Sequence, residues 1–372
     1  MKFTATSSEL QRALAKVGGV IPSKSTLPIL ENILFHLVSD TLTITATDME
    51  ISLTVSLQVK GKEDGKAAIP AKRLLDTVRS LPPDTTPTFS IEASTNKVTI
   101  ATANGHYSLT GESAEEFPPN PQFKETDEIV LDNASLRNII HRTSFAVSTD
   151  ELRPAMMGVL LQPKGSDLRA VSTDGHRLVK LTQKLPKGVS LKRDVIIPAK
   201  ALNLVGKSIE TGESTVSLSE THVRFAFDKT IVISRLIDEV YPNYESVIPQ
   251  DNTKIMSVDR EQTIASLRRV ALYASATTHQ VKFGVKNTLL TLSAQDIDFG
   301  GEAKETIECE YKGEDIEIGF NSNYVIDILS HMDADQIAFK FSAPTRAGIV
   351  TPVNVKNGED IIMLVMPVRL NA

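Results

Sequence analysis

Cysteine and tryptophan are nearly missing from this chain of 372 residues, which has one cysteine, Cys309, and no tryptophan. A single cysteine cannot form an intrachain disulfide, and it cannot build a cysteine-based metal site. The two glutamates beside Cys309 also disfavour a reactive thiolate. Aromatic residues make up only 5% of the sequence, which argues against a platform that stacks single-stranded bases.

Long apolar runs are also missing, because none reaches the roughly 18 residues of a membrane span. Residues 1–7 contain no apolar segment typical of a secretory signal. Apolar residues (41%) and charged residues (23%) occur at the levels of a soluble globular protein. We therefore expect a cytoplasmic protein without a membrane partner. The net charge of −6 argues against an indiscriminate polyanion binder.

The sequence motifs of common enzymes are absent as well. There is no Gly-x-Ser-x-Gly, no Walker loop, no Gly-x-Gly-x-x-Gly and no His-Glu-x-x-His, and the seven histidines do not pair at metal-ligand spacing. Ser172, Asp174 and His176 have the residue types of a catalytic triad, but alternate residues of one extended segment do not converge as a triad requires. We expect no catalytic residues, no metal site and no cofactor, and we interpret His176 as a hydrogen-bonded turn residue.

Three kinds of marker recur along the chain at nearly equal intervals. An aspartate in a polar bend recurs at intervals of 126 and 122 residues, an Ile-Pro-Ala-Lys helix start at 128 and 123, and a proline after an aromatic residue or methionine at 124 and 125. All of these intervals are close to 124, which is one third of the chain length. The markers are Asp48, Asp174 and Asp296; Pro70, Pro198 and the diverged Asn321; and Pro118, Pro242 and Pro367.

A period of this length corresponds to a whole domain. We predict three domains, with the ranges 1–124, 125–250 and 251–372. Each copy begins with a short strand and a helix, continues with alternating strands, and has a second helix at the Ile-Pro-Ala-Lys position. Hairpin-like turns between the strands favour antiparallel sheets over a βαβ fold. The prediction is an α+β chain, made of three tandem repeats of one domain with an antiparallel sheet and two helices.

The six expected helices are amphipathic, and most carry basic residues on the polar face. We expect Ser7 and Asn133 to cap two of them, and Pro70 and Pro198 to lie in the first turn of two others. Together the helices carry a charge of +6, so the rest of the chain carries −12. A basic face on a single helix is explained as solvated surface. The separation of positive charge on the helices from negative charge on the rest of the chain instead predicts a positive helical surface that faces a polyanion. The expected ranges are 7–18, 71–81, 133–147, 198–208, 259–274 and 321–333.

Three segments carry a family resemblance: Thr173–Leu178, Tyr241–Pro242 and Val365–Leu370. They resemble the bacterial β sliding clamps, the processivity subunits of the DNA polymerase III holoenzyme, and the segments Thr26–Leu30 and Thr47–Glu50 match that family's first domain. The resemblance covers the whole chain in order. It implies a head-to-tail homodimer whose six domains form a ring, with helices lining a hole that encircles double-stranded DNA without sequence specificity.

The resemblance also implies a cleft between the second and third domains that binds peptide motifs of the polymerase, the clamp loader and other partners. Leu178, Met366 and Pro367 would supply an apolar pocket there, and Arg177 would help to orient the peptide. Carried over residue by residue, the cleft comprises Met156, Thr173, Gly175, His176, Arg177, Leu178, Pro242, Val247, Leu364, Val365, Met366, Pro367, Val368, Arg369 and Leu370.

Two further surfaces follow from the resemblance. Tyr107 of the first domain would meet Leu272 and Tyr273 of the third domain across the dimer contact. The candidate DNA contacts are Lys24, Arg73, Arg79, Arg137, Lys200 and Lys207. The sequence departs from the family pattern, with an effect on peptide preference, at Pro154, Ala155, Glu245, Ser246 and the final Asn371–Ala372.

Two other functions are compatible with a tandem repeat. An adaptor that binds only proteins would be a monomer and would ignore DNA. An enzyme acting on carbohydrates or nucleotides would need paired carboxylates in a recognisable motif, and the sequence contains none. We therefore expect a DNA polymerase processivity factor, with the protein-binding adaptor as the alternative.

Overall fold

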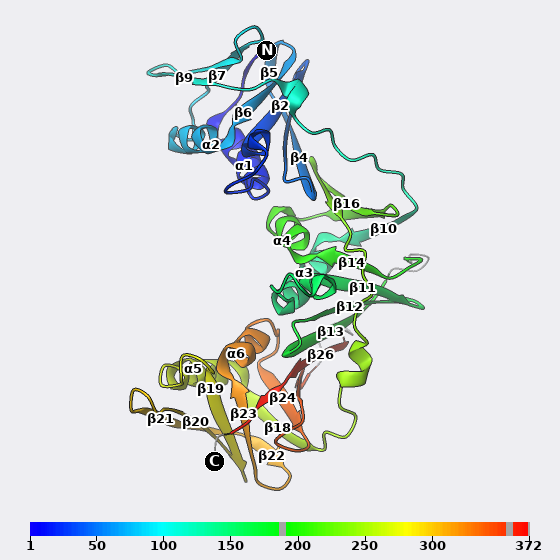
Figure 1. Cartoon of the computed structure of the whole chain (residues 1–372), viewed down its shortest axis with the longest axis vertical. Helices are drawn as coiled ribbons and strands as arrows, with labels where there is room; N and C mark the ends of the chain where they lie inside the picture. The colour runs from blue at the N-terminus through cyan, green and yellow to red at the C-terminus, as the bar shows by residue number, and fades with distance from the viewer. Residues whose placement is uncertain (186–190, 355–359, 371–372) are drawn as a thin grey trace. The chain divides into compact units, whose positions relative to one another are not determined.

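The computed structural model describes residues 1–185, 191–354 and 360–370 (Figure 1). The chain forms two compact units. Unit 1 consists of Met1–Arg137 and Lys200–Leu236, and unit 2 consists of Asn138–Ala199 and Ile237–Ala372. Each unit therefore combines one terminal third of the chain with part of the central third.

Within the described residues, unit 1 contains a five-stranded sheet and an eight-stranded sheet, and every strand pair in them is antiparallel. The five-stranded sheet has the order β5 (Lys60–Glu63), β1 (Lys2–Thr4), β7 (Thr88–Glu92), β8 (Lys97–Ala101) and β9 (His106–Thr110). The eight-stranded sheet has the order β10 (Asp127–Asp132), β15 (Glu213–Leu218), β16 (His222–Phe227), β17 (Thr230–Arg235), β4 (Ile51–Gln58), β3 (Thr41–Thr47), β2 (Asn32–Val38) and β6 (Gly65–Pro70).

Unit 2 contains, in its described part, a nine-stranded and a five-stranded sheet, again with antiparallel pairs. The nine-stranded sheet has the order β14 (Val195–Pro198), β11 (Gly158–Lys164), β12 (Asp167–Thr173), β13 (Arg177–Lys184), β26 (Asp360–Val365), β25 (Gly348–Pro352), β24 (Gln336–Phe341), β18 (Lys254–Asp259) and β22 (Glu310–Lys312). The smaller sheet has the order β21 (Gly301–Glu308), β20 (Leu289–Asp296), β19 (Gln280–Lys286), β23 (Ile316–Asn321) and β27 (Pro367–Val368).

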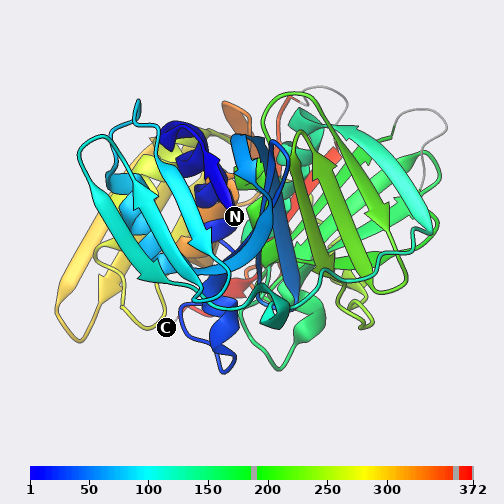
Figure 2. The same cartoon turned by 90° about the horizontal axis from the view of Figure 1, so that it is seen from above.

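The two larger sheets each contain strands from neighbouring repeats. In unit 1, β4 of the first repeat pairs with β17 of the second, and Figure 2 shows these blue and green strands side by side. In unit 2, β13 of the second repeat pairs with β26 of the third. The predicted antiparallel architecture is confirmed, and it continues across the junctions between repeats.

Six α-helices in the described residues cover one face of these sheets, near the predicted positions. Buried apolar residues recur along them at helical spacing, as Leu10, Leu14 and Val17 do in the first. The bounds are α1 (Ser7–Gly18), α2 (Ala71–Ser80), α3 (Asn133–Thr143), α4 (Ala199–Ser208), α5 (Arg260–Ala271) and α6 (Ser322–Ser330). No helix in the described part of the chain is both long enough and apolar enough to span a membrane.

The predicted caps are wrong by one residue. The Thr6 side chain accepts from Glu9 N, whereas the buried Ser7 hydroxyl donates to Pro82 O at 2.5 Å. Asp132 accepts from Ser135 N at 2.8 Å, and the buried Asn133 amide instead accepts from the Ser214 hydroxyl. Both predicted caps are thus used by distant partners in the core, and their neighbours satisfy the helix N–H groups.

The prolines of the repeated helix start also lie one residue earlier than predicted. Pro70 ends β6 and precedes α2 with φ −54° and ψ 114°, and Pro198 ends β14 immediately before α4. An extended ψ before the first helical residue suits a cap position, so the proline fixes the strand-to-helix corner.

Candidate functional site

A tight turn between β12 and β13 forms the first part of the site. Asp174 Oδ1 accepts from His176 N at 2.8 Å and from Arg177 N at 2.9 Å. The Thr173 hydroxyl donates to Arg177 O at 2.7 Å and accepts from Gly175 N. Gly175 has a φ of +90°, which favours glycine. The polar residues of the predicted motif therefore hold the turn together.

The same turn recurs in the first repeat. Asp48 Oδ1 accepts from Glu50 N at 3.1 Å and Ile51 N at 2.7 Å, and the Thr47 hydroxyl donates to Ile51 O at 2.9 Å. In the third repeat, Asp296 accepts from the two corresponding backbone N–H groups. The aspartate turn is therefore a structural feature of every repeat.

The Arg177 side chain lies beneath its turn and is only 11% exposed. Its guanidinium donates to Asp174 at 3.0 Å, to Asp327 of α6 at 2.5 Å and to Phe145 O at 2.9 Å. It also lies 5.0 Å from the centre of the Tyr324 ring. These contacts give Arg177 a structural role, and its contact with a partner peptide stays a prediction.

Pairing of β13 with β26 brings together residues that are far apart in the sequence. Leu178 lies opposite Leu364, Arg177 lies opposite Val365, and Met366 N donates to His176 O at 2.8 Å. The turn and the carboxyl-terminal strand thus form one continuous edge of the site.

An apolar cluster, here called the junction cluster, lies on one face of these strands. Leu178 and Leu364 are 1% and 2% exposed in it, packed with Tyr244 and Ile248 of the unit 2 segment that follows β17. Leu178 therefore supports the surface from below instead of forming an open pocket wall. The cluster consists of Leu160, Val171, Leu178, Ile196, Tyr244, Ile248, Ala347, Ile349 and Leu364.

Solvent-exposed apolar side chains surround the junction cluster. Val247 is 52% exposed and Met366 is 40% exposed, and Pro242 is also exposed. Met156 is buried, and its side chain lies near the position that a Cβ at Gly175 would occupy. These exposed groups offer a surface for apolar anchors of a partner.

The last described residues turn away from the junction cluster. Pro367 and Val368 pair with Phe320 and Gly319 of β23, and the Leu370 side chain lies against Gly319. Val365 is buried and Arg369 is exposed. The structure therefore places residues 364–366 at the cluster and 367–370 beside the smaller sheet, whereas Asn371 and Ala372 lie outside the described residues.

The segment that covers the cluster is fixed by polar contacts. The Tyr244 hydroxyl donates to Gln162 at 2.8 Å, and Arg169 donates to Glu245 at 2.7 Å. Burial raises the pKa of Tyr244, so its hydroxyl stays a donor at neutral pH. The Ser246 hydroxyl donates to Asn243 O at 2.8 Å. Two of the departures from the family pattern thus take part in local structure.

Two further departures, Pro154 and Ala155, lie in the short 3₁₀ helix Pro154–Met157. Ala155 packs against the junction cluster, and Pro154 is exposed.

The first junction between repeats provides an internal comparison. Arg235 N donates to Glu50 O at 2.9 Å, in the place where Met366 N donates to His176 O. Ser52 stands where the second junction has Leu178, and its hydroxyl donates to Asn120 at 2.6 Å. The same backbone arrangement is therefore polar at the first junction and apolar at the second, so the fold does not require the apolar surface.

Tyr324 and Asp327 are site residues that the sequence pattern did not predict. The Tyr324 ring stacks on the His176 ring with their centres 5.6 Å apart, and Asp327 holds Arg177. Both residues lie on α6, in the diverged third copy of the helix-start motif. The helix-start motif could have indicated them, because it marks the second helix of each repeat, and that helix comes after the recurring aspartate turn.

The candidate DNA-contact residues occur in different environments. Arg137 donates to Ile209 O at 2.5 Å at the end of α4, and Lys200 forms an ion pair with Asp48. Lys24, Arg73, Arg79 and Lys207 are exposed. The structure thus gives two of the six candidates intramolecular partners.

Exposed apolar residues also mark the predicted dimer contact. Tyr107 on β9 is 41% exposed, and Leu272 and Tyr273, which follow α5, are 80% and 48% exposed. The turn between β20 and β21 adds Ile297 and Phe299, which are 78% and 87% exposed and were not among the predicted contact residues. Tyr273 lies beside Gly301 of the same turn region.

Models of three protein domains match almost the whole chain. They are the N-terminal domain of the DNA polymerase III beta subunit at residues 1–121, its central domain at 130–243 and its C-terminal domain at 245–369. The beta sliding clamp of Chlamydia muridarum is 30% identical, and that of Caulobacter vibrioides is 31% identical. Both alignments cover 100% of each chain.

Solved structures are similar over the same length. The DnaN sliding clamp of Bartonella birtlesii bound to griselimycin has 29% identity and a TM-score of 0.94. The griselimycin-bound clamp of Pseudomonas aeruginosa has 29% identity and a TM-score of 0.91. Each comparison covers 100% of both chains.

Proposed function

The chain belongs to the DNA polymerase III beta subunit family, the beta sliding clamps that act as polymerase processivity factors, and from this premise we propose that two copies close head to tail around duplex DNA. The proposed clamp domains are residues 1–124, 125–250 and 251–372. The protein would act in the cytoplasm as a tether without catalytic activity of its own. The protein-only adaptor is not favoured, because clamp-domain models match all three thirds of the chain.

The contrast between the two junctions carries the proposal for the partner site. Met366, His176 and Leu178 occupy the positions that Arg235, Glu50 and Ser52 occupy at the first junction. Exposed methionine adapts to different anchoring side chains, which suits a site that several partners share. We place the peptide motifs of the polymerase, the clamp loader and other clamp-binding proteins on this surface, beside His176 and Tyr324.

A recurring contact supports the proposed dimer. The first turn contacts the second helix of the next repeat through Asp48 and Lys200, and the second turn does so through Arg177 and Asp327. The third turn bears the exposed Ile297 and Phe299. By the same relation, this turn would meet α2 of another copy.

The surface beside α2 suits such a contact. A pocket of about 700 Å³ there is lined by Lys72, Arg73 and Leu75, together with Leu109 of β9. The lining also includes Arg79 and the acidic residues Glu31, Asp76 and Glu112, so the complementarity to the turn rests on apolar contact with Leu75 and Leu109. Tyr107 on β9 would then approach Leu272 and Tyr273 of the partner copy.

The proposed DNA contact is electrostatic. Exposed Lys24, Arg79 and Lys207 would meet the phosphate backbone, and Arg73, Arg137 and Lys200 would add positive charge near it. The ring would hold the duplex by encircling it, so few tight contacts are needed and the clamp can slide.

Retention on DNA tests this function. A bacterial clamp loader with ATP places the labelled protein on a nicked circular plasmid, and gel filtration separates bound from free protein before and after the plasmid is linearised. We expect the protein to stay on the circle at moderate salt and to run off the linear DNA. Equal loss from both forms, rising steeply with salt, would identify an ordinary electrostatic binder instead.

A further inference from the structure

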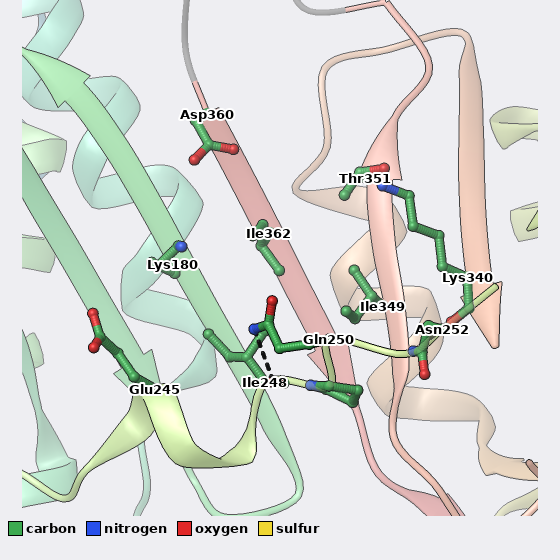
Figure 3. Close-up of a pocket in the computed structure, with 11 residues that line it drawn as sticks. Lys180, Glu245, Ile248, Gln250, Asn252, Lys340, Ile349, Thr351, Asp360 and Ile362 are labelled. Carbon is green, nitrogen blue, oxygen red and sulfur yellow. Dashed lines mark hydrogen bonds between the residues drawn. The ribbon is translucent and has the colours of Figure 1, made fainter. Parts of the chain in front are cut away.

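A second hollow lies on the same sheet face as the junction cluster. It is a pocket of about 540 Å³ lined by residues of β13, β26, β25 and β24, and the segment 245–252 forms its wall (Figure 3). Such a volume accommodates two or three amino-acid side chains. Its lining includes Lys180, Ile248, Lys340, Ile349, Asp360 and Ile362.

The pocket is continuous with the proposed partner site. Lys180 follows Leu178 on the same face of β13, because alternate residues of a strand share a face. Ile362 precedes Leu364 on the same face of β26, and it lies opposite Lys180. Ile248 and Ile349 belong to both the junction cluster and the pocket lining. The segment around Ile248 therefore crosses the sheet between the exposed Met366 and this pocket.

Local hydrogen bonds fix the pocket wall. The Gln250 amide donates to Ile248 O at 3.2 Å, drawn as a dashed line in Figure 3. The Asn252 amide donates to Lys340 O at 2.9 Å and to Ala347 O at 3.0 Å. Asn252 thus attaches the wall to β24 and to the residue before β25, and the Gln250 bond fixes the wall internally, so a ligand would enter a largely preformed site.

The charge in the pocket favours an anionic ligand. Lys180 and Lys340 have no ion-pair partner among the described residues, and both residues line the pocket. Glu245 is already neutralised by Arg169, at 2.7 Å. Asp360 is the one other carboxylate in the described lining. Three isoleucines lie between these charges. The lining itself has two lysines and two carboxylates, and because Arg169 pairs with Glu245, one lysine charge is left uncompensated above the apolar floor.

We propose that this pocket is a second subsite for partner proteins, which takes an acidic segment flanking the residues that anchor at Met366. The carboxylates of that segment would pair with Lys180 and Lys340, and its carbon atoms would cover Ile349 and Ile362. Five extended residues span roughly 17 Å. This is about the length of the part of β26 that lies between Met366 and the pocket. This inference rests on the proposed partner site, and the test separates the two.

The test measures fluorescence anisotropy with a labelled peptide that spans the clamp-binding segment of the polymerase catalytic subunit. Further peptides carry Gly-Glu-Glu at the amino end or at the carboxyl end, and matched peptides carry Gly-Gln-Gln. We expect one Glu-containing extension to lower the Kd for the protein about threefold to tenfold, with a smaller gain at high salt. The Gln-containing extensions should give no gain.

Variants identify the origin of the gain. In Lys180→Gln with Lys340→Gln, the gain should disappear while the unextended peptide binds normally. The control Lys60→Gln with Lys62→Gln makes the same charge change on β5, and it should keep the gain. The absence of a gain at either end, or a gain that persists without the two pocket lysines, would overturn the subsite. Unchanged binding of the unextended peptide to Met366→Ala would instead overturn the partner site itself.

Discussion

The Arg177 guanidinium donates to the Asp327 carboxylate at 2.5 Å, across 150 residues of sequence. This ion pair joins the second aspartate turn to α6 of the third repeat. At the first junction, Lys200 pairs with Asp48 in the corresponding relation, but the Lys200 side chain is 53% exposed and that of Arg177 is 11% exposed. In each pair the turn residue is the more buried partner, because Asp48 is 14% exposed and Asp327 is 47% exposed. The second pair differs because Arg177 also donates to Asp174 and to Phe145 O, so it belongs to a larger hydrogen-bond network.

Removing the carboxylate from this pair should destabilise the protein. Asp327→Asn leaves the buried Arg177 with one fewer charged acceptor, and we expect the free energy of unfolding to fall by about 1–2 kcal/mol. The exposed counterpart Lys200→Gln should lose less than about 1 kcal/mol. Urea unfolding followed by circular dichroism measures both, and equal losses would contradict the importance of the hydrogen-bond network around Arg177.

Truncating Met366 should weaken partner binding without affecting assembly. Met366→Ala removes an exposed apolar anchor point, and we expect the Kd for the polymerase peptide to rise about tenfold or more. Arg235→Ala changes the corresponding position of the polar junction and should leave the Kd unchanged. Fluorescence anisotropy gives the affinities, and sedimentation velocity verifies that both variants remain dimers. A similar loss of peptide affinity in both variants would contradict the assignment of the partner site to the second junction.

A charge on the third turn should separate the proposed dimer. Ile297→Asp places a carboxylate where an apolar contact with a second copy is expected, and the desolvation of that charge opposes association. Sedimentation velocity at micromolar concentration should show monomers. Val240→Asp introduces the same charge at an apolar residue that is 91% exposed outside this turn, and it should remain a dimer. A dimeric Ile297→Asp variant would exclude this turn from the interface.

The histidines between α3 and α6 should make stability depend on pH. His141 lies with its ring centre 4.7 Å from that of His331, which stacks on Phe145. Burial lowers the pKa of His141, and the neighbouring His331 and Arg142 lower it further. At pH values between the lowered pKa of His141 in the folded protein and its unfolded value near 6.5, the unfolded chain binds more protons than the folded protein. The free energy of unfolding is therefore retained above this pH range and falls as the pH drops through it.

The measurement for this prediction compares melting temperatures at pH 7.5 and 5.0. His141→Gln removes the titrating group, so we expect a smaller decrease on acidification than in the unsubstituted protein. An identical decrease would assign the acid sensitivity to other groups.

Features that depend on local sequence were predictable. Each aspartate turn is closed by bonds from residues two and three positions later, so Asp48, Asp174 and Asp296 were sufficient to identify it. The helices followed from apolar periodicity. The caps were wrong because Asn133 is used by Ser214, which lies 81 residues away and has no local signal.

The site was only partly predictable for the same reason. The family resemblance brought His176 and Met366 into one cleft, but the burial of Leu178 depends on Tyr244 and Ile248 folding over it. Tyr324 and Asp327 become visible only when α6 is placed against the turn. Periodicity and composition describe single elements, and these contacts join elements of different repeats.

The pairing of β4 with β17 and of β13 with β26 has a consequence for dividing the chain. The sequence repeats every third of its length, but a fragment cut at one period would leave β4, β13 or β26 with unsatisfied backbone N–H and C=O groups along an open edge. Such edges recruit strands from other molecules and lead to aggregation. One sequence repeat is therefore not expected to fold by itself, and a stable truncation would have to keep each sheet whole.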